Sequence, residues 1–238
     1  LVAEGSMGAA AVMVTGRPLT PEEAIGTPGR RDYPILLGKE RVLEARVNGC
    51  RGQAYTDSAS EFEGTLSDIL ALNLATNANR AIFVAVMNAV LKQLEAVEET
   101  IHCRDDEPER CGEELVRHLR QEYSPADVAL VGLNPALAHA LVESFGADRV
   151  RVTDLNPDNI GTVRFGVEIW DGASRVNDLA RASDVVVITG TTLGNGTFDA
   201  LRSAIQSHGK QLLVYGVTSV GVCCLLGLPH FCPLGRST

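Results

Sequence analysis

The sequence of 238 residues has no apolar run as long as the roughly 18 residues that suggest a membrane-spanning helix. Its opening, LVAEGSMGAA, lacks the charged leader and the cleavage pattern of a secretory signal peptide. Basic residues are fewer than acidic ones: the chain has 21 Lys and Arg and 30 Asp and Glu, which gives a formal net charge of −9. These absences predict a cytoplasmic protein with no membrane or nucleic-acid partner, whose six cysteines are reduced thiols.

The glycine-rich motifs of nucleotide-binding proteins are missing as well. No segment has the lysine of the GxxxxGKS/T phosphate-binding loop, and Gly132 stands alone in VGLNP, where a GxGxxG fingerprint would begin. Asp154 ends the following strand, where a nucleotide ribose would be hydrogen-bonded, but Asp also favours ordinary strand-end turns. A nucleotide-type cofactor is therefore an alternative and not the first expectation.

The first half of the chain reads as strands followed by helices. After a Pro/Gly-rich arm at 15–34, residue patterns predict short strands at 41–47 and 52–57. Helices are expected at 64–75 and 80–97, and the second of these is apolar nearly all round, as is typical of a buried core helix.

From about Glu114 onward, short apolar runs alternate with helical patterns. Strands are expected at 127–132, 149–155, 184–189 and 211–216, and helices at 115–123, 135–145, 176–182 and 198–208. This alternation predicts a parallel sheet covered by helices on both faces. The fold class is therefore α/β, with a Rossmann-like domain in the second half.

Four segments that follow these strands, GLNP, TDLNPDN, TGTTLGNGT and GVTSVG, are rich in glycine, hydroxyl and amide groups. Ligands of open parallel sheets bind beyond the carboxyl ends of the strands, so the four segments predict one polar-lined site. The candidate ligand-binding residues are Gly132, Asn134, Asp154, Asn159, Thr189, Gly190, Thr191, Thr192, Asn195, Thr197, Gly216 and Thr218.

Two polar segments carry soft metal-binding side chains. His102, Cys103 and Cys111 lie in IHCRDDEPERC, and Cys232 lies in HFCP. Thiolate and imidazole suit zinc, copper(I) and heavier thiophilic metals, so these four residues are candidate ligands of a transition or heavy metal ion. The spacing matches no standard zinc finger, and a free cysteine is as readily a small buried hydrophobe, which is our interpretation of the remaining cysteines.

The chain resembles the "putative heavy-metal chelation" domain family through DVVVITGTTLGNGT, MNAVL, VGLNP, TDLNPDNIG and YGVTSVG. HCRDDEPERC and HFCP are similar to elements of a thiol-bearing subgroup. The resemblance implies a smaller α+β domain, like the N-terminal domain of enolase, at 17–122 and a Rossmann-like domain at 123–238, with the ligand cleft between them. Residues 1–16 are then a tag remnant and arm, because Leu1–Ser6 resemble part of a cleavable tag and Met7 is the expected natural start.

Two polar residues of the predicted helix at 80–97 are further candidates. Arg80 could hold a carboxylate-bearing ligand by a bidentate contact, although such an arginine is more often a surface or packing residue. Asn88 is a polar residue in an apolar helix and must find hydrogen-bond partners. Those partners are either neighbouring backbone groups or, as the resemblance suggests, a ligand in the cleft.

Three functions are compatible with these patterns. The preferred one is a cytosolic protein that binds a metal ion or a small-molecule chelate in the cleft. The alternative is an enzyme acting on a small polar or anionic metabolite, with a nucleotide-type cofactor, although no nucleophile elbow and no HExxH motif are present. An assembly component with an incidental cleft is hardest to reconcile with four polar loops at one sheet edge. A homodimer is an open alternative to a monomer.

Overall fold

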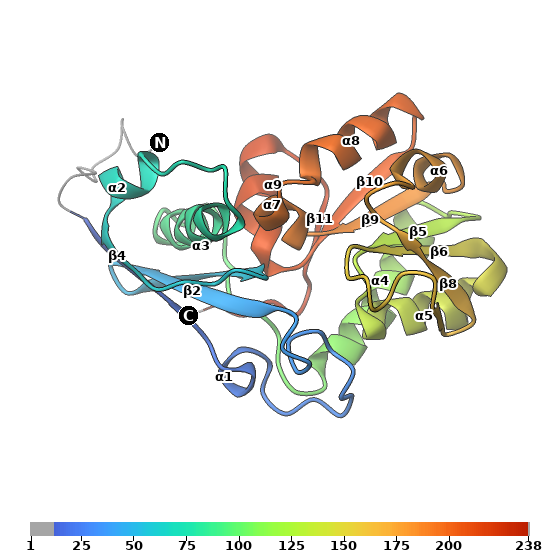
Figure 1. The fold of residues 1–238 in the computed structure, drawn as a ribbon, viewed down its shortest axis with the longest axis horizontal. Coiled ribbons are helices and arrows are strands. Elements are labelled where there is room, and N and C mark those ends of the chain that lie inside the picture. Colours follow the sequence, from blue (N-terminus) through green and yellow to red (C-terminus); the bar gives the residue numbers. More distant parts are fainter. Residues whose placement is uncertain (1–11, 238) are drawn as a thin grey trace.

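The computed structural model describes residues 12–237, in which two β-sheets lie side by side with helices packed against them (Figure 1). The expected tag remnant lies outside these residues. The first sheet is antiparallel, with the strand order β3-β2-β1-β4. Its strands are β1 (Met13–Pro18), β2 (Arg41–Val47), β3 (Cys50–Thr56) and β4 (Phe62–Thr65).

Strands β2 and β3 form a hairpin, and a long helix packs on their sheet. Asn48 and Gly49 have φ angles of 49° and 86°, as a two-residue type I′ turn requires. Helix α3 (Asn77–Gln93) lies across one face of the sheet (Figure 1). Gly52 permits a close approach, because a Cβ at this position would lie 2.3 Å from the carbonyl oxygen of Ala85. Strand β3 and helix α3 therefore meet backbone to backbone.

The segment 15–34, which the sequence predicts as an arm, contains the end of β1 and the short helix α1 (Pro21–Ile25). Thr20 caps this helix: its hydroxyl accepts the N–H of Glu23 at 3.2 Å, and the Glu23 carboxylate accepts the N–H of Thr20 at 2.9 Å. The arm prediction was wrong here because proline begins helices as well as turns.

The second sheet has the strand order β11-β10-β9-β5-β6-β8-β7 and is mostly parallel, with β7 antiparallel to β8. Its strands are β5 (Val128–Val131), β6 (Val150–Asp154), β7 (Val163–Arg164), β8 (Val167–Asp171), β9 (Val185–Thr189), β10 (Gln211–Tyr215) and β11 (His230–Phe231). The prediction of a mixed α/β fold with a mostly parallel sheet is confirmed. The Rossmann-like and enolase-like descriptions, and the boundary at 122, remain predictions.

Helices cover both faces of the second sheet (Figure 1). Leu130 of β5 packs into the core beneath one pair of helices, and Val131 packs into the core beneath the other pair, since successive strand residues point to opposite faces. The first pair is α4 (Glu107–Glu122) and α5 (Pro135–Phe145), and the second pair is α6 (Val176–Arg181) and α8 (Phe198–Ser207).

Several short elements differ from the sequence-based expectation. The TGTTLGNGT segment, expected to be an open loop, contains helix α7 (Thr191–Asn195), and the helix expected at 64–75 is only α2 (Leu66–Leu70). Strand β8 was not predicted, because acidic residues interrupt its apolar pattern. The remaining elements are η1 (Ala147–Arg149), η2 (Val217–Ser219) and α9 (Val220–Leu226). Within residues 12–237, no helix is long and apolar enough to cross a membrane.

Asn88, in the middle of α3, is fully buried and connects the two sheets. Its Nδ2 group donates to the carbonyl oxygens of Gln53, Val217 and Thr218 at 3.0, 3.2 and 3.3 Å. Its Oδ1 atom accepts the N–H of Gly221 at 3.0 Å. One amide therefore joins β3 of the first sheet to the segment that follows β10 of the second.

We expect Asn88→Ala to lower the free energy of unfolding by about 3 kcal/mol, because it leaves a buried N–H and buried carbonyl groups without partners. Chemical denaturation measures the effect. The matched control is Asn79→Ala on the same helix, whose half-buried amide donates to the carbonyl of Asn73 at 2.7 Å and which we expect to cost less than about 1 kcal/mol. Equal losses in the two variants would show that Asn88 does not join the sheets.

Candidate functional site

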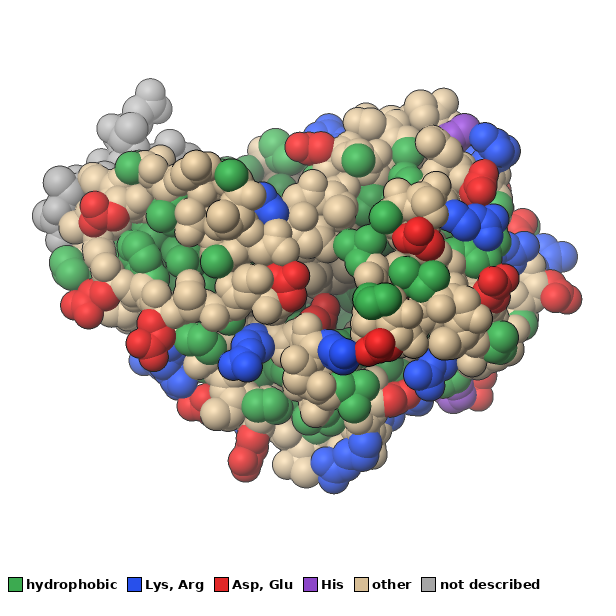
Figure 2. Space-filling model, in the orientation of Figure 1, with side chains coloured by type: hydrophobic (Ala, Val, Ile, Leu, Met, Phe, Trp, Pro, Cys, Tyr) green, Lys and Arg blue, Asp and Glu red, His purple; other side chains and the backbone are tan. Residues whose placement is uncertain are grey.

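A cavity of about 560 Å³ lies between the two sheets, beyond the carboxyl ends of β5, β6, β9 and β10. Tyr55 and Asp57 line it from the side of the first sheet, and Gly132, Asp154 and Thr189 line it from the second. The face drawn in Figure 2 is hollowed between these two parts of the molecule. The cavity lies where the strand order reverses between β5 and β9, and its volume suits a small molecule.

Every strand-end residue that the sequence singled out lines this cavity, because the carboxyl ends of parallel strands meet at one sheet edge. These residues are Gly132, Asn134, Asp154, Asn159, Thr189, Gly190, Thr191, Thr192, Asn195, Thr197, Gly216 and Thr218. Their contact with a ligand stays a prediction.

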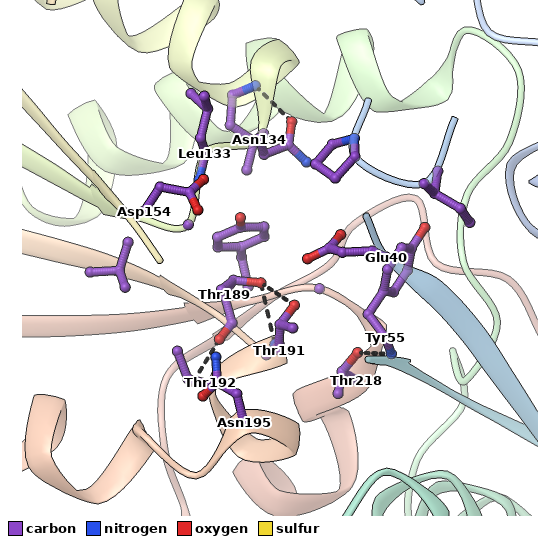
Figure 3. A pocket seen from close by; sticks show the side chains of 18 of the residues that line it. Glu40, Tyr55, Leu133, Asn134, Asp154, Thr189, Thr191, Thr192, Asn195 and Thr218 are labelled. Atoms are coloured by element: carbon purple, nitrogen blue, oxygen red, sulfur yellow. Dashed lines mark hydrogen bonds between the residues drawn. The ribbon is translucent and has the colours of Figure 1, made fainter. Parts of the chain in front are cut away.

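Threonine hydroxyl groups shape the wall after β9 and β10 (Figure 3). The hydroxyl oxygens of Thr189 and Thr191 lie 3.0 Å apart, and Thr192 Oγ1 donates to the carbonyl oxygen of Thr189 at 2.7 Å. Thr218 Oγ1 accepts the N–H of Tyr55 at 2.9 Å. The first three residues fold the chain into α7, and the last contact holds β3 against the segment after β10.

Asp154 organises the opposite wall. Its Oδ2 atom accepts the N–H of Leu133 at 3.0 Å and the side-chain amide of Asn159 at 3.2 Å, and its Oδ1 atom accepts the N–H of Asn156 at 2.7 Å. Both carboxylate oxygens are therefore used within the chain. Gly132 has a φ of 86°, and a Cβ there would lie 2.7 Å from Thr189 Cγ2, so this turn fits tightly against β9.

His102, Cys103, Cys111 and Cys232 line the same cavity. His102 Nδ1 bonds to the carbonyl oxygen of Cys103. Because a carbonyl only accepts, Nδ1 carries the proton, and the lone pair of Nε2 is left for a metal ion. Burial lowers the pKa of His102 to about 4, so the ring is neutral near pH 7, as metal binding requires.

The three thiols are protonated at neutral pH. Burial raises the pKa of Cys111 to about 11, that of Cys232 to about 12 and that of Cys103 further, and the last two are raised again by their thiol neighbours. In the part of the chain that the structure describes, no group of three or more His, Cys, Asp and Glu side chains is arranged to hold a metal ion. The four soft donors thus share a cavity without forming a preassembled metal site.

Two of the predicted site residues lie outside the cavity lining, which corrects their expected place in the cleft. Arg80 donates from Nε to the carbonyl of Gly194 at 2.9 Å and from its Nη1 to that of Leu74 at 2.7 Å, so it fixes α7 against the start of α3. Asn88 uses its whole amide in the bonds described above. Both side chains bond to the protein's own backbone.

The lining residues that were not predicted include Glu40, Tyr55, Asp57 and Tyr215. Tyr55 and Asp57 lie at the end of a correctly predicted strand, and Glu40 directly precedes another. The rule that pointed to the strand-end loops applies to parallel sheets and gives no expectation for the antiparallel sheet. The useful signal was the position of Glu40 and Asp57 at neighbouring ends of one hairpin.

Glu40 points into the cavity toward the space that separates it from Asp154 and Thr189 (Figure 3). Among the described residues its carboxylate has no hydrogen-bond or ion-pair partner. Burial, with the nearby charges of Asp154 and Asp57, raises the pKa of Glu40 to about 7. The cavity therefore contains a carboxyl group that is half ionised near neutral pH.

The fold and the cavity define an α/β protein with a small-molecule-sized site at the edge of a mostly parallel sheet. Residues 114–228, just under half of the chain, match the model of the DUF364 family, which is described as "Putative heavy-metal chelation". This segment contains the polar loops after β5, β6, β9 and β10. His102, Cys103, Cys111 and Cys232 lie outside it. No curated protein matches the chain.

Two solved structures from the DUF364 family are similar to the chain, and both are described as proteins of unknown function. The one from Desulfitobacterium hafniense has 12% sequence identity and a TM-score of 0.52, over 79% of this chain and 72% of that one. The one from Pyrococcus horikoshii has 17% identity and a TM-score of 0.48, over 76% and 69%. At such identities the similarity to the first concerns the fold alone.

We expect Glu40→Gln to stabilise the protein more at about pH 8 than at about pH 5, because the folded-state pKa of Glu40 is raised to about 7. At the lower pH the folded protein holds this carboxyl protonated, whereas at the higher pH it must hold a charge beside Asp154. Melting temperatures of both proteins at the two pH values test this. Glu61→Gln, a change at an exposed carboxylate outside the cavity lining, is the control. A stability difference independent of pH would contradict the raised pKa.

Proposed function

We propose that the protein binds a thiophilic metal ion, in complex with a small organic molecule, in the cavity between the two sheets. The observation that carries this proposal is that one cavity is lined by four soft donors and also by the polar loops of the strand ends. Sulfur and imidazole nitrogen suit the metal, and hydroxyl, amide and backbone groups suit a polar organic molecule. The family description of residues 114–228 supports the same function.

A metal complex fits the donor arrangement better than a bare ion. Structural zinc and related ions take about four ligands, yet no group of three donors is assembled among residues 12–237. A complex brings part of its coordination sphere with it and needs one or two further ligands from the protein. The free Nε2 of His102 and the thiol of Cys103, which lies 3.8 Å from the same ring, are suited to this role.

The alternative of an enzyme with a nucleotide-type cofactor has less support. Asp154, the residue expected to bind a ribose, already accepts three hydrogen bonds from the chain. Phosphate groups in the cavity would meet Asp154, Asp57 and Glu40. Among the lining residues described, Lys39 is the one lysine or arginine, and it pairs with Asp158 at 2.7 Å. An anionic ligand therefore has no unpaired cation to bind.

We expect anaerobically purified protein to bind Zn²⁺ in the presence of diethylenetriamine, a chelator that coordinates the ion through three uncharged amine nitrogens, at about one equivalent and more tightly than Zn²⁺ alone. Cys103→Ser with Cys111→Ser should abolish this binding. The matched control is Cys50→Ser with Cys224→Ser, which removes two thiols outside the cavity lining. Equilibrium dialysis with metal analysis measures the stoichiometry. Unchanged binding in the first double variant would contradict the proposal.

Zinc affinity should also rise with pH, because each thiol must lose its proton before it binds the metal. Burial raises the pKa of Cys111 to about 11 and that of Cys232 to about 12, so near neutral pH every thiolate formed releases a proton. We expect affinity to increase about tenfold per pH unit for each thiol that binds. A competition titration with a zinc indicator at several pH values measures the slope. An affinity independent of pH would exclude the thiols as ligands.

A further inference from the structure

The acidic side chains that line the cavity differ in how many hydrogen bonds they accept from the rest of the chain. Asp154 accepts three hydrogen bonds from the turns after β5 and β6. Asp57 accepts the hydroxyl of Ser58 at 2.7 Å and the side-chain amide of Asn77 at 3.0 Å. Glu40 has no such partner among the described residues, although it points into the same space (Figure 3). Its two oxygens are therefore the ones available to a ligand.

Among the described lining residues, the one lysine or arginine is already paired. Lys39, beside Glu40 in sequence, bonds to Asp158 at 2.7 Å. The lining thus carries the carboxyl groups of Asp57, Asp154 and Glu40, and a cation in the cavity would balance their charge.

Two tyrosine rings also line the cavity, Tyr55 of β3 and Tyr215 at the end of β10. Burial raises the pKa of each phenol, and Glu40 raises it further, so both hydroxyl groups remain neutral. The faces of neutral aromatic rings attract ammonium and guanidinium groups, so tyrosines in the same lining as an unpartnered carboxylate favour a cationic ligand.

We propose that this end of the cavity binds an organic cation, an ammonium or guanidinium group, whose charge is held by the Glu40 carboxylate. This inference rests on the proposed function because it concerns the same cavity. It specifies the organic molecule that binds there as a cation. Asp57 and Asp154 attract the cation from a distance, and Glu40 contacts it. Anions such as phosphates and dicarboxylates are excluded by the same charges.

The bound cation would favour the ionised form of Glu40, which the free protein holds only in part near neutral pH. The groups that face Glu40 are Asp154 of β6, Asp57 after β3, Tyr55 of β3 and Tyr215 of β10. Both tyrosines stay neutral, and hydrogen bonds from Ser58 and Asn77 lower the pKa of Asp57 against the effect of burial. Glu40 is therefore the group whose ionisation couples to the binding of a cation around pH 7.

Isothermal titration calorimetry with agmatine, which carries a guanidinium and an ammonium group, tests this proposal against succinate and 1,4-butanediol. We expect saturable binding of agmatine and none of the anion or the neutral diol. Glu40→Gln should weaken agmatine binding about tenfold or more, because it replaces a charged hydrogen bond by a neutral one. Glu61→Gln, at an exposed site outside the lining, should leave binding unchanged.

The dependence on pH separates a direct contact from a structural effect. Agmatine affinity should rise between about pH 6 and about pH 8 in the unmodified protein, as Glu40 ionises, and should be flat in Glu40→Gln. No saturable agmatine binding, equal affinity in Glu40→Gln, or preference for succinate would each overturn the proposal.

The thiol variants distinguish this result from the proposed function. Cys103→Ser with Cys111→Ser should bind agmatine normally while failing to bind zinc. Zinc binding without agmatine binding overturns the organic cation alone, and agmatine binding without zinc binding overturns the metal complex alone.

Discussion

One buried amide, that of Asn88, joins the two sheets, and the cavity lies between those sheets. Asn88 bonds at once to β3 through the carbonyl of Gln53 and to the segment after β10 through Val217, Thr218 and Gly221. An apolar contact tolerates sliding, whereas an amide with four fixed partners in a dry environment does not. The hydrogen bond from the N–H of Tyr55 to Thr218 Oγ1 lies at the same junction and directly borders the cavity. A residue outside the cavity thus sets the distance across it.

That fixed geometry explains why an unpaired carboxyl persists in the cavity wall. Glu40 directly precedes β2, whose pairing with β1 and β3 fixes the backbone at its start. Asp154 is fixed on the facing wall by three hydrogen bonds. The charge of Asp154 raises the pKa of Glu40 across the cavity, and a cationic ligand would relieve this repulsion. Functional sites commonly store destabilisation in this way.

The strands of the second sheet could be predicted from the sequence more completely than those of the first sheet. Apolar runs such as 184–189 mark buried parallel strands directly, and the carboxyl ends of such strands converge by geometry, so the loop residues from Gly132 to Thr218 were found. In the first sheet, β1 is not an apolar run, and its partners are set by long-range pairing. The sequence places Glu40 and Asp57 at neighbouring ends of one hairpin, but it does not show that Glu40 lacks a partner, because that is a property of the folded structure.

Arg80 and Asn88 were candidate ligand-binding residues from the sequence, but the sequence could not identify their actual partners. A polar residue in an apolar helix indicates that a partner exists, but the sequence does not say whether the partner is a ligand or the backbone. For both residues it is the backbone, at Gly194 and Leu74 for Arg80 and at four positions for Asn88. Arg80 holds α7 against the start of α3, and Asn88 holds α3 against the segment after β10.

The soft donors and the polar loops are separate contributions to one cavity. The loops after β5, β6, β9 and β10 lie within the segment 114–228 that matches the DUF364 family, whereas His102, Cys103, Cys111 and Cys232 flank that segment on both sides. A ligand that spans the cavity would therefore meet a family-shared edge of oxygen and nitrogen groups and a sulfur-bearing wall specific to the flanking sequence. Under the proposed function, selectivity for a soft metal would be set by the flanks, and recognition of the organic molecule would be set by the loops of the matched segment together with Glu40. This division follows from softness matching, since sulfur discriminates among metals far more strongly than carboxylate or hydroxyl oxygen does.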